Sequence, residues 1–279
     1  MFGPTPVTLA SLIEDFQQLG VSSGETLLLH SSLRSLGSWV CGGATTVVAA
    51  LLEVLGPEGT LVVPAQSPET KDPSRWSHIS VPEQWWPTIR EQMAPFDPAL
   101  TPATTVGVIA ERVRTWPGAV RSAHPLTSFA AIGAGAERLL EGHELSSLLG
   151  EASPLARLEA AGSRILLLGV GYDRCTAFHL AEYRLPDPPI RTASCLVATD
   201  RGREWVDFDT VDLDSAEFEL IGKELEASVG WVRTGRVAAA ESRLLPLRES
   251  VQFAYESLLR QRSRRTRPRA DATAAPGRR

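Results

Sequence analysis

The chain has 279 residues, 43% of them hydrophobic and 22% charged, a composition typical of a soluble globular protein with one large α/β domain or two small ones. Its three cysteines are odd in number and lack paired metal-ligand spacing, which argues against a disulfide framework and for a reducing compartment. No apolar run is long enough to span a membrane, and the first residues lack the pattern of a secretory signal. We therefore expect a cytoplasmic protein without a membrane segment.

The net charge of −5 conceals an uneven distribution. Residues 260–279 carry eight arginines and one acid, Asp271, so residues 1–259 hold 20 basic against 32 acidic side chains and a net charge of −12. A body this acidic concentrates small cations by long-range attraction. The alternative is that the acidic surface only keeps the protein soluble.

The N-terminal part of the chain has the order helix, strand, loop, helix, strand. Apolar residues at helical spacing predict a helix from Leu9 that ends at Gly20. A buried strand is predicted at residues 26–30, a Ser/Gly-rich loop at 31–43, a helix at 46–55 and a second strand at 60–64. This order implies parallel strands joined by a right-handed crossover.

Residues 66–105, which we call the excursion, break this order. They contain seven prolines and three tryptophans, Trp76, Trp85 and Trp86, without sustained periodicity. A loop this long in a compact domain is usually functional, and its aromatic rings, mixed with acids such as Asp72, suit a lid over a ligand. The alternative is a structural excursion that packs its tryptophans on the core.

Strands and helices return after the excursion. Strands are predicted at residues 127–132, 165–170 and 231–237, a hairpin at 194–199 and 204–208, and helices at 154–161, 215–229 and 247–259. We therefore predict an α/β fold with a central, largely parallel sheet flanked by helices, a long substrate-side loop insertion and a smaller C-terminal α/β portion. A single domain covers residues 1–261, and the Arg-rich residues 262–279 are predicted to be disordered.

The segment from Thr176 to Glu182 places a hydroxyl, an imidazole and a carboxylate at i, i+3 and i+6. In a helix, Thr176, His179 and Glu182 are successively one turn apart and can touch. An imidazole beside a carboxylate is the minimum for a tuned general base. Because the segment follows a predicted strand, and ligands of open α/β sheets bind beyond the carboxyl ends of strands, we expect the active site here.

Two glycine motifs match known functional patterns only in part. Residues 20–24 match the G-x-S-x-G pattern, but a helix precedes Ser22 and a strand follows it, the reverse of a serine-hydrolase elbow. Gly169 and Gly171 could begin a dinucleotide fingerprint, but Arg174 stands at the third glycine position, so we interpret them as a tight turn.

Cys175 leaves two other chemistries open. With His179 at i, i+4 it could form a thiolate nucleophile and its base. With His179 and Glu182 it could hold a metal ion, although no second His or Cys lies nearby in sequence. We expect no metal.

Two further clusters stand at predicted strand–loop junctions. In the first, hydroxyls, backbone N–H groups and a following helix N-terminus form a natural anion cradle. In the second, an arginine and a histidine have the chemistry to hold a phosphate or an amide chain. Together they indicate a long, anionic, partly apolar ligand such as coenzyme A. The first cluster comprises His30, Ser31, Ser32, Leu33 and Val40, and the second comprises Arg121, Ser122, His124, Ser128 and Phe129.

Ordered blocks along the chain resemble the aminoglycoside 3-N-acetyltransferases, antibiotic N-acetyltransferases that are distinct from the GNAT fold. The set is more specific than any single motif, and it runs in order across about residues 8–260, leaving the basic tail outside. The matching blocks are residues 30–33, 42–44, 55–62, 96–98, 121–125, 153–155, 167–170 and 176–182.

The resemblance implies transfer of an acetyl group from acetyl-CoA to an amine, most often the 3-amino group of a 2-deoxystreptamine ring. It further implies that His179 is the general base and that Glu182 orients it and contacts the substrate. Thr176 is similar to a family hydroxyl near the thioester and would stabilise the tetrahedral intermediate. The two clusters look like coenzyme A contacts, and Asp72 and Asp173 are candidates for holding a substrate ammonium.

An amine is a good nucleophile once it is neutral, so we expect direct transfer in a ternary complex without a covalent enzyme intermediate. The acidic body suits a polycationic aminoglycoside. Two other hypotheses stay open: the same fold and donor with a different amine, and nucleic-acid binding through the short Arg-rich tail. We expect small-molecule partners, no nucleic acid or membrane, a monomer or homodimer, and a role in antibiotic resistance.

Overall fold

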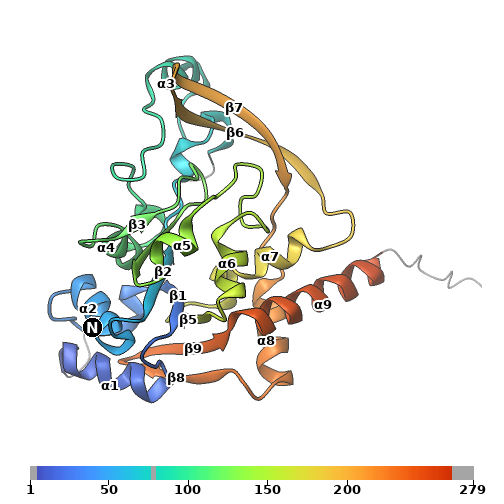
Figure 1. Cartoon of the computed structure of the whole chain (residues 1–279). Coiled ribbons are helices and arrows are strands. Elements are labelled where there is room, and N and C mark those ends of the chain that lie inside the picture. The colour runs from blue at the N-terminus through green and yellow to red at the C-terminus, as the bar shows by residue number, and fades with distance from the viewer. Residues whose placement is uncertain (1–4, 77–79, 266–279) are drawn as a thin grey trace, which may run out of the picture.

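The computed structural model describes residues 5–76 and 80–265 of the chain. Helices cover both faces of a mixed sheet (Figure 1). The strands are β1 (Thr26–Ser31), β2 (Thr60–Pro64), β3 (Val120–Arg121), β4 (Phe129–Gly133), β5 (Arg164–Leu168), β6 (Ile190–Thr199), β7 (Gly202–Val211), β8 (Arg233–Val237) and β9 (Ala240–Pro246). The helices are α1 (Leu9–Leu19), α2 (Ala44–Leu55), α3 (Trp86–Gln92), α4 (Val108–Arg114), α5 (Ala136–Leu140), α6 (Pro154–Ala160), α7 (Phe178–Tyr183), α8 (Phe218–Ser228) and α9 (Leu247–Arg265).

The main sheet is parallel at its centre and antiparallel at its flanks. In the described part of the chain it has seven strands in the order β3-β4-β2-β1-β5-β9-β8. β1 pairs in parallel with β2 and β5, placing Leu28 opposite Val62 on one side and Ile165 on the other. β4 pairs antiparallel to β2, and β9 pairs antiparallel to β5. The predicted α/β fold is therefore confirmed, whereas β3 and β9 are strands that the sequence analysis did not predict.

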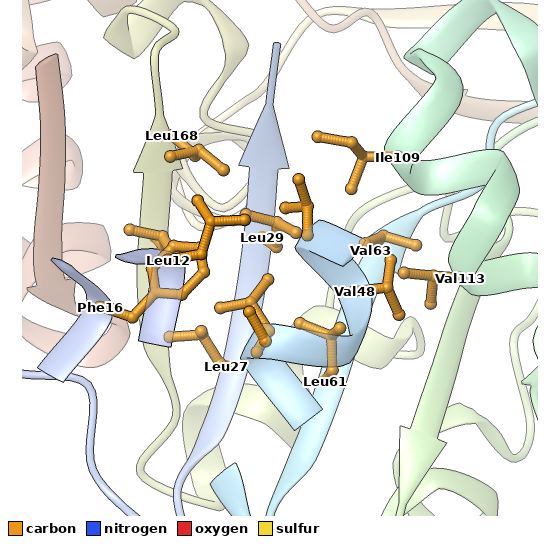
Figure 2. Close-up of a cluster of buried hydrophobic side chains, with 14 of the residues drawn as sticks. Leu12, Phe16, Leu27, Leu29, Val48, Leu61, Val63, Ile109, Val113 and Leu168 are labelled. Carbon is orange, nitrogen blue, oxygen red and sulfur yellow. The ribbon is translucent and has the colours of Figure 1, made fainter. Parts of the chain in front are cut away.

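The alternation of side chains along the central strands divides the core between the two faces of the sheet. Leu27 and Leu29 of β1 belong to the cluster that packs on α1, α2 and α4, and Figure 2 shows these leucines with Leu12 and Phe16 of α1. Leu28, between them, belongs to the opposite cluster, which packs on α5, α6, α7, α8 and α9. Strands covered on both faces need continuous apolar runs, and burying each leucine fully stabilises the fold by roughly 2 kcal/mol.

The predicted helix ends are formed by local hydrogen bonds. The Thr8 side chain accepts a hydrogen bond from the backbone N–H of Ser11 at the start of α1, and Gly20, with φ 102°, ends it. Ser153 caps α6 by accepting from Leu155, with Pro154 in the first turn. Side-chain oxygens satisfy orphan N–H groups at helix starts, and glycine adopts the left-handed conformation at helix ends without steric cost.

The excursion packs on the β6–β7 hairpin, which forms a separate two-stranded sheet (Figure 1). Arg203 of β7 donates to the backbone carbonyl of Arg90, and Trp205 Nε1 donates to the same oxygen at 3.3 Å. Lys71 forms an antiparallel bridge with β6. Trp85 is 54% exposed, and neither of the other two tryptophans is buried. The alternative that the excursion packs its tryptophans on the core is therefore wrong.

The C-terminal helix is longer than predicted. α9 runs from Leu247 to Arg265, so residues 262–265, predicted to be disordered, are helical. Val251 and Ala254 anchor the first half of α9 in the core, and a helix once nucleated extends at low cost. The other residues of the predicted disordered tail lie outside the described residues. Within the described ranges, no helix is both long and apolar enough to cross a membrane.

Candidate active site

A cleft of about 980 Å³ opens at the carboxyl ends of the three parallel strands. The end of β1 and the residue after it contribute residues 29–32, the end of β2 contributes Pro64, and the turn after β5 contributes residues 169–171. The excursion and the start of α4 also contribute to the lining. The remaining lining residues are Asp173, Arg174, Thr176, His179 and Ser215. The cleft thus lies where ligands of α/β sheets bind.

The turn after β5 requires glycine. Gly169 has φ 64°, and a Cβ at this position would lie 2.4 Å from the Cβ of Ser35. The Ser35 hydroxyl donates to the carbonyl of Gly169 at 2.7 Å. This contact joins the loop after β1 to the segment that carries His179, so both walls of the cleft are held in one arrangement.

His179 and Glu182 form a hydrogen-bonded pair on α7. His179 Nδ1 lies 2.5 Å from Glu182 Oε2, and Glu182 Oε1 accepts from the backbone N–H of Asp214 at 2.9 Å. The buried carboxylate, 7% exposed, therefore has a partner for each oxygen. The ring of Phe218 packs on the imidazole with centroids 4.7 Å apart. Because Nδ1 is engaged, Nε2 is the nitrogen available to a ligand in the cleft.

Thr176 lines the same cleft but lies outside the helix. α7 begins at Phe178, so the expectation that one helix carries all three residues is wrong. The hydroxyl of Thr176 lies 3.4 Å from His30 Nε2, and the Thr176 carbonyl accepts from the backbone N–H of His179 at 3.1 Å. Thr176 therefore stands in the turn that leads into α7, with its hydroxyl near His30 of β1.

His30, at the end of β1, is 6% exposed and lines the cleft. Burial, and then repulsion from a charged His179, lower its pKa from 6.5 to about 3. Desolvation disfavours the charged imidazolium, so His30 is neutral at physiological pH. The cleft therefore contains one histidine with a carboxylate partner and one that is kept neutral.

The first cluster is divided between the cleft and the core. Ser31 and Ser32 line the cleft with His30. Val40 is buried in the core beneath α1 and α2, and Leu33 packs on the same core. Neither Leu33 nor Val40 is in the lining of the cleft. Their predicted contact with coenzyme A stays a prediction, and their observed role is apolar packing.

Arg121 of the second cluster holds both ends of the excursion. Its guanidinium donates to the carbonyl of Ala65 and the hydroxyl of Ser67, both at 2.6 Å, and to the carbonyl of Thr101. Its Nε donates to Ser128 at 3.0 Å. Burial lowers the pKa of Arg121 to about 10, so the side chain stays charged at neutral pH. Neither Arg121 nor Ser128 lines the cleft.

The remaining members of the second cluster are also buried. His124 Nε2 donates to the carbonyl of Leu145 at 3.2 Å, and its Nδ1 accepts from the backbone N–H of Leu126 at 3.0 Å. Ser122 accepts from the backbone of Phe129 at 2.9 Å. None of Ser122, His124 and Phe129 is in the lining of the cleft. The second cluster builds the excursion and the turn before β4, and its predicted contacts with coenzyme A stay predictions.

The two aspartates differ in position. Asp72 accepts from Arg90 Nε at 2.7 Å and Nη2 at 2.9 Å, and does not line the cleft. Hydrogen bonds from Arg90 and then from Ser74 hold the pKa of Asp72 at about 2. Asp173 lines the cleft and pairs with Arg174 at 3.0 Å. Asp173 is therefore the better placed of the two to meet a ligand.

Cys175 is fully buried, and burial raises the pKa of its thiol to about 12. A thiol with so high a pKa is not ionised at neutral pH, so a Cys175 thiolate nucleophile is excluded. Among the residues that the structure describes, no group of three or more His, Cys, Asp or Glu side chains could hold a metal ion.

Several lining residues have no motif in the sequence. Gln66 and Lys71 come from the excursion, and Ser215 follows the β6–β7 hairpin. Asp214, whose backbone supports Glu182, and Phe218, which packs on His179, come from the same region after the hairpin. The length of the excursion was the signal that pointed to the first group. No local spacing pointed to the second, because the hairpin brings it back to α7 from more than thirty residues away.

The fold is that of an α/β protein with a cleft at the carboxyl ends of its parallel strands, and the His–Glu pair in this cleft has the groups that general-base chemistry needs. The family model of the aminoglycoside 3-N-acetyltransferases matches residues 28–259, so the chain belongs to this family of acyltransferases, as the resemblance predicted.

Relatives match this chain in sequence and in structure over most of its length. It is 41% identical over 250 residues to the SPbeta prophage-derived aminoglycoside N(3')-acetyltransferase-like protein YokD of Bacillus subtilis, covering 89% of this chain and 91% of the relative. The crystal structure of YokD superposes with a TM-score of 0.89, covering 93% and 96% of the two chains. AAC-IIIb in a binary complex with CoASH gives 0.81 at 32% identity, covering 92% and 98%. AAC-VIa bound to sisomicin gives 0.82 at 34% identity, covering 92% and 99%.

Proposed function

We propose that this enzyme transfers the acetyl group of acetyl-CoA to the 3-amino group of the 2-deoxystreptamine ring of an aminoglycoside and thereby confers resistance. The observation that carries the proposal is the 2.5 Å pair of His179 and Glu182 beside the cleft. Relatives of the same fold bind CoASH, in AAC-IIIb, and sisomicin, in AAC-VIa. The net charge of −12 over residues 1–259 attracts a polycation.

The reaction needs one base and one site for a developing negative charge. The neutral amine attacks the thioester carbonyl, a C–N bond forms, and the carbonyl electron pair moves to oxygen. His179 Nε2 takes a proton from the nitrogen, and Glu182 stabilises the imidazolium through Nδ1. The carbonyl then reforms, the C–S bond breaks, and the sulfur takes the proton from His179. The products are the N-acetyl amide and the free thiol of coenzyme A.

The other cleft residues supply binding. Thr176 donates a hydrogen bond to the oxyanion of the tetrahedral intermediate. Ser31 and Ser32 contact the coenzyme A moiety from the end of β1. Asp173 holds an ammonium group of the acceptor. In each case the residue lines the cleft and its side chain can make the proposed hydrogen bond or ion pair.

Thiol release from acetyl-CoA with gentamicin, kanamycin, neomycin and apramycin as acceptors tests the proposal. Wild type should release thiol much faster with an acceptor than with water alone, and His179→Ala should lower kcat for the acceptor about 10³-fold because it removes the base. His143→Gln, a histidine replacement outside the cleft, is the matched control and should keep kcat. NMR of the product gives the acetylated position. A burst of acetyl-enzyme before amine is added would contradict direct transfer.

One observation favours a second candidate, the same donor with a different amine. Lys71 is half-buried in the cleft lining, and in the described ranges no carboxylate forms an ion pair with it. A cation here opposes a polycationic acceptor and favours an amine with less positive charge. Failure of the whole aminoglycoside panel, with protein that still binds acetyl-CoA in calorimetry, would support this candidate.

A further inference from the structure

We propose that His30 is a positioning residue for acyl transfer: as a neutral imidazole it donates its Nε2 proton to Thr176 Oγ1. The hydroxyl proton of Thr176 is then free to donate to the reacting carbonyl oxygen. The inference rests on the function proposed above and deepens it, because it gives a role to the second histidine of the cleft.

The geometry brings three side chains from two parts of the chain to one wall. His30 is the last residue but one of β1, whereas Thr176 and His179 come from the turn and helix after β5, and all three line the cleft. His30 Nε2 lies 3.4 Å from Thr176 Oγ1. This distance is at the long end for a hydrogen bond, as is common in unliganded active sites, where such bonds tighten when the substrate binds.

Neutrality of His30 decides what Thr176 can do. Burial and the neighbouring His179 lower the pKa of His30 to about 3, so it does not compete for the proton that His179 takes from the amine. A neutral imidazole has one N–H donor and one acceptor nitrogen. If Nε2 were the acceptor, the hydroxyl proton of Thr176 would be donated to His30 and would not be available to the ligand. If Nε2 donates, the hydroxyl proton is left for the ligand.

The arrangement meets a requirement of acyl transfer. Charge develops on the carbonyl oxygen in the transition state, and donors stabilise it most when they are already oriented. A threonine hydroxyl proton rotates freely unless a partner occupies the lone pairs of the oxygen. His30, held by the central strand β1, is a rigid partner. It acts on the reaction through Thr176 and does not itself need to touch the substrate.

A double-mutant cycle separates this role from a contact with coenzyme A. Thr176→Val should lower kcat about 10²-fold, as loss of one oxyanion donor does. His30→Met should lower kcat roughly tenfold with KM for acetyl-CoA unchanged, and the double variant should be no slower than Thr176→Val alone. His30→Gln, which keeps a donor, should recover most of the rate. Independent, multiplicative losses, or a raised KM with unchanged kcat, would overturn the proposal.

The same cycle is measured on the slow release of thiol with water as the acceptor. This reaction passes through a tetrahedral adduct with the same developing oxyanion and needs no particular amine. Failure of every aminoglycoside would then reject the proposed acceptor and leave the role of His30 testable. NMR of histidine labelled with ¹⁵N in wild type gives a readout independent of turnover, with His30→Gln assigning the signals. The Nε2–H tautomer across neutral pH is expected, and the Nδ1–H tautomer would overturn the proposal.

Discussion

His30 and His179 line the cleft, whereas the buried His124 and the half-buried His143 pack together outside it with ring centroids 4.4 Å apart. Burial lowers the pKa of His124 to about 4 and, with repulsion from His124, that of His143 to about 3. Their hydrogen bonds go to backbone groups and to hydroxyls, while His179 has Glu182 at 2.5 Å. A carboxylate partner and access to a cleft, rather than the residue type, therefore equip a histidine for proton transfer.

Acidification should have the largest effect, and it should lower the stability of the folded protein. His30, His124 and His143 all have pKa values depressed from an ordinary 6.5 in the folded protein. Below pH 6.5 the unfolded chain binds more protons than the folded protein. The stabilisation from these neutral histidines is therefore fully present above pH 6.5, and it is lost as the pH falls toward the pKa values of the folded protein. Each histidine should cost about 1.4 kcal/mol per pH unit in that window.

Urea unfolding at several pH values checks this expectation. His143→Gln should show a shallower loss of unfolding free energy on acidification than wild type, because one of the three linked groups is gone. An equal pH dependence in the two proteins would show that His143 is not the linked group. The His179→Ala variant serves as the matched comparison on the cleft side.

Replacement of Glu182 should have the next largest effect, which is a lower kcat. Glu182→Gln keeps an acceptor for the backbone N–H of Asp214 but offers His179 an amide in place of a carboxylate. We expect kcat to fall about 10²-fold, close to 3 kcal/mol of transition-state stabilisation, because the imidazolium loses its counter-charge. Steady-state kinetics together with a melting curve measure both quantities. A variant that loses stability but keeps kcat would reverse the assignment.

Replacement of His143 should have the opposite signature. His143→Gln loses the ring that packs on His124, and its shorter side chain cannot keep both the bond to Leu148 and the bond to Ser122. The free energy of unfolding should fall by about 2 kcal/mol, because the ring contact with His124 and at least one hydrogen bond to a buried partner are lost. The specific activity of the folded fraction should not change. A loss of kcat without a loss of stability would place this interior pair in the reaction.

The smallest effect is expected at Asp72. Asp72→Asn removes an ion pair whose arginine is 39% exposed, so the free energy of unfolding should change by at most about 1 kcal/mol. Because Asp72 is paired with Arg90 and does not line the cleft, KM for an aminoglycoside should stay within about twofold of wild type, a difference of about 0.4 kcal/mol. Asp173→Asn is the matched variant inside the cleft. A large rise of KM in Asp72→Asn alone would restore the predicted ammonium contact.

Local patterns were sufficient for much of the fold. The apolar runs at residues 26–30 and 60–64 predicted buried parallel strands, because strands covered on both faces have no polar positions. The N-terminal helix and its end at Gly20 followed from helical spacing and the left-handed conformation of glycine. β9 was missed because the turn Ala238–Ala239 that leads into it lacks the glycine or asparagine expected of a tight hairpin, although Ala238 adopts a φ of 51°.

The contact between His179 and Glu182 could be predicted from the chain alone, since side chains at i and i+3 of a helix are neighbours on its surface. Packing of the whole domain was needed to bring Thr176 to His30, 146 residues earlier in the chain. It also decided that Ser31 faces the cleft while Ser122 is buried behind β4, although the two residues stand in clusters of similar composition. Spacing along the chain fixes neighbours within one turn, whereas strand order and register fix the neighbours of distant residues, and these depend on the packing of the whole core.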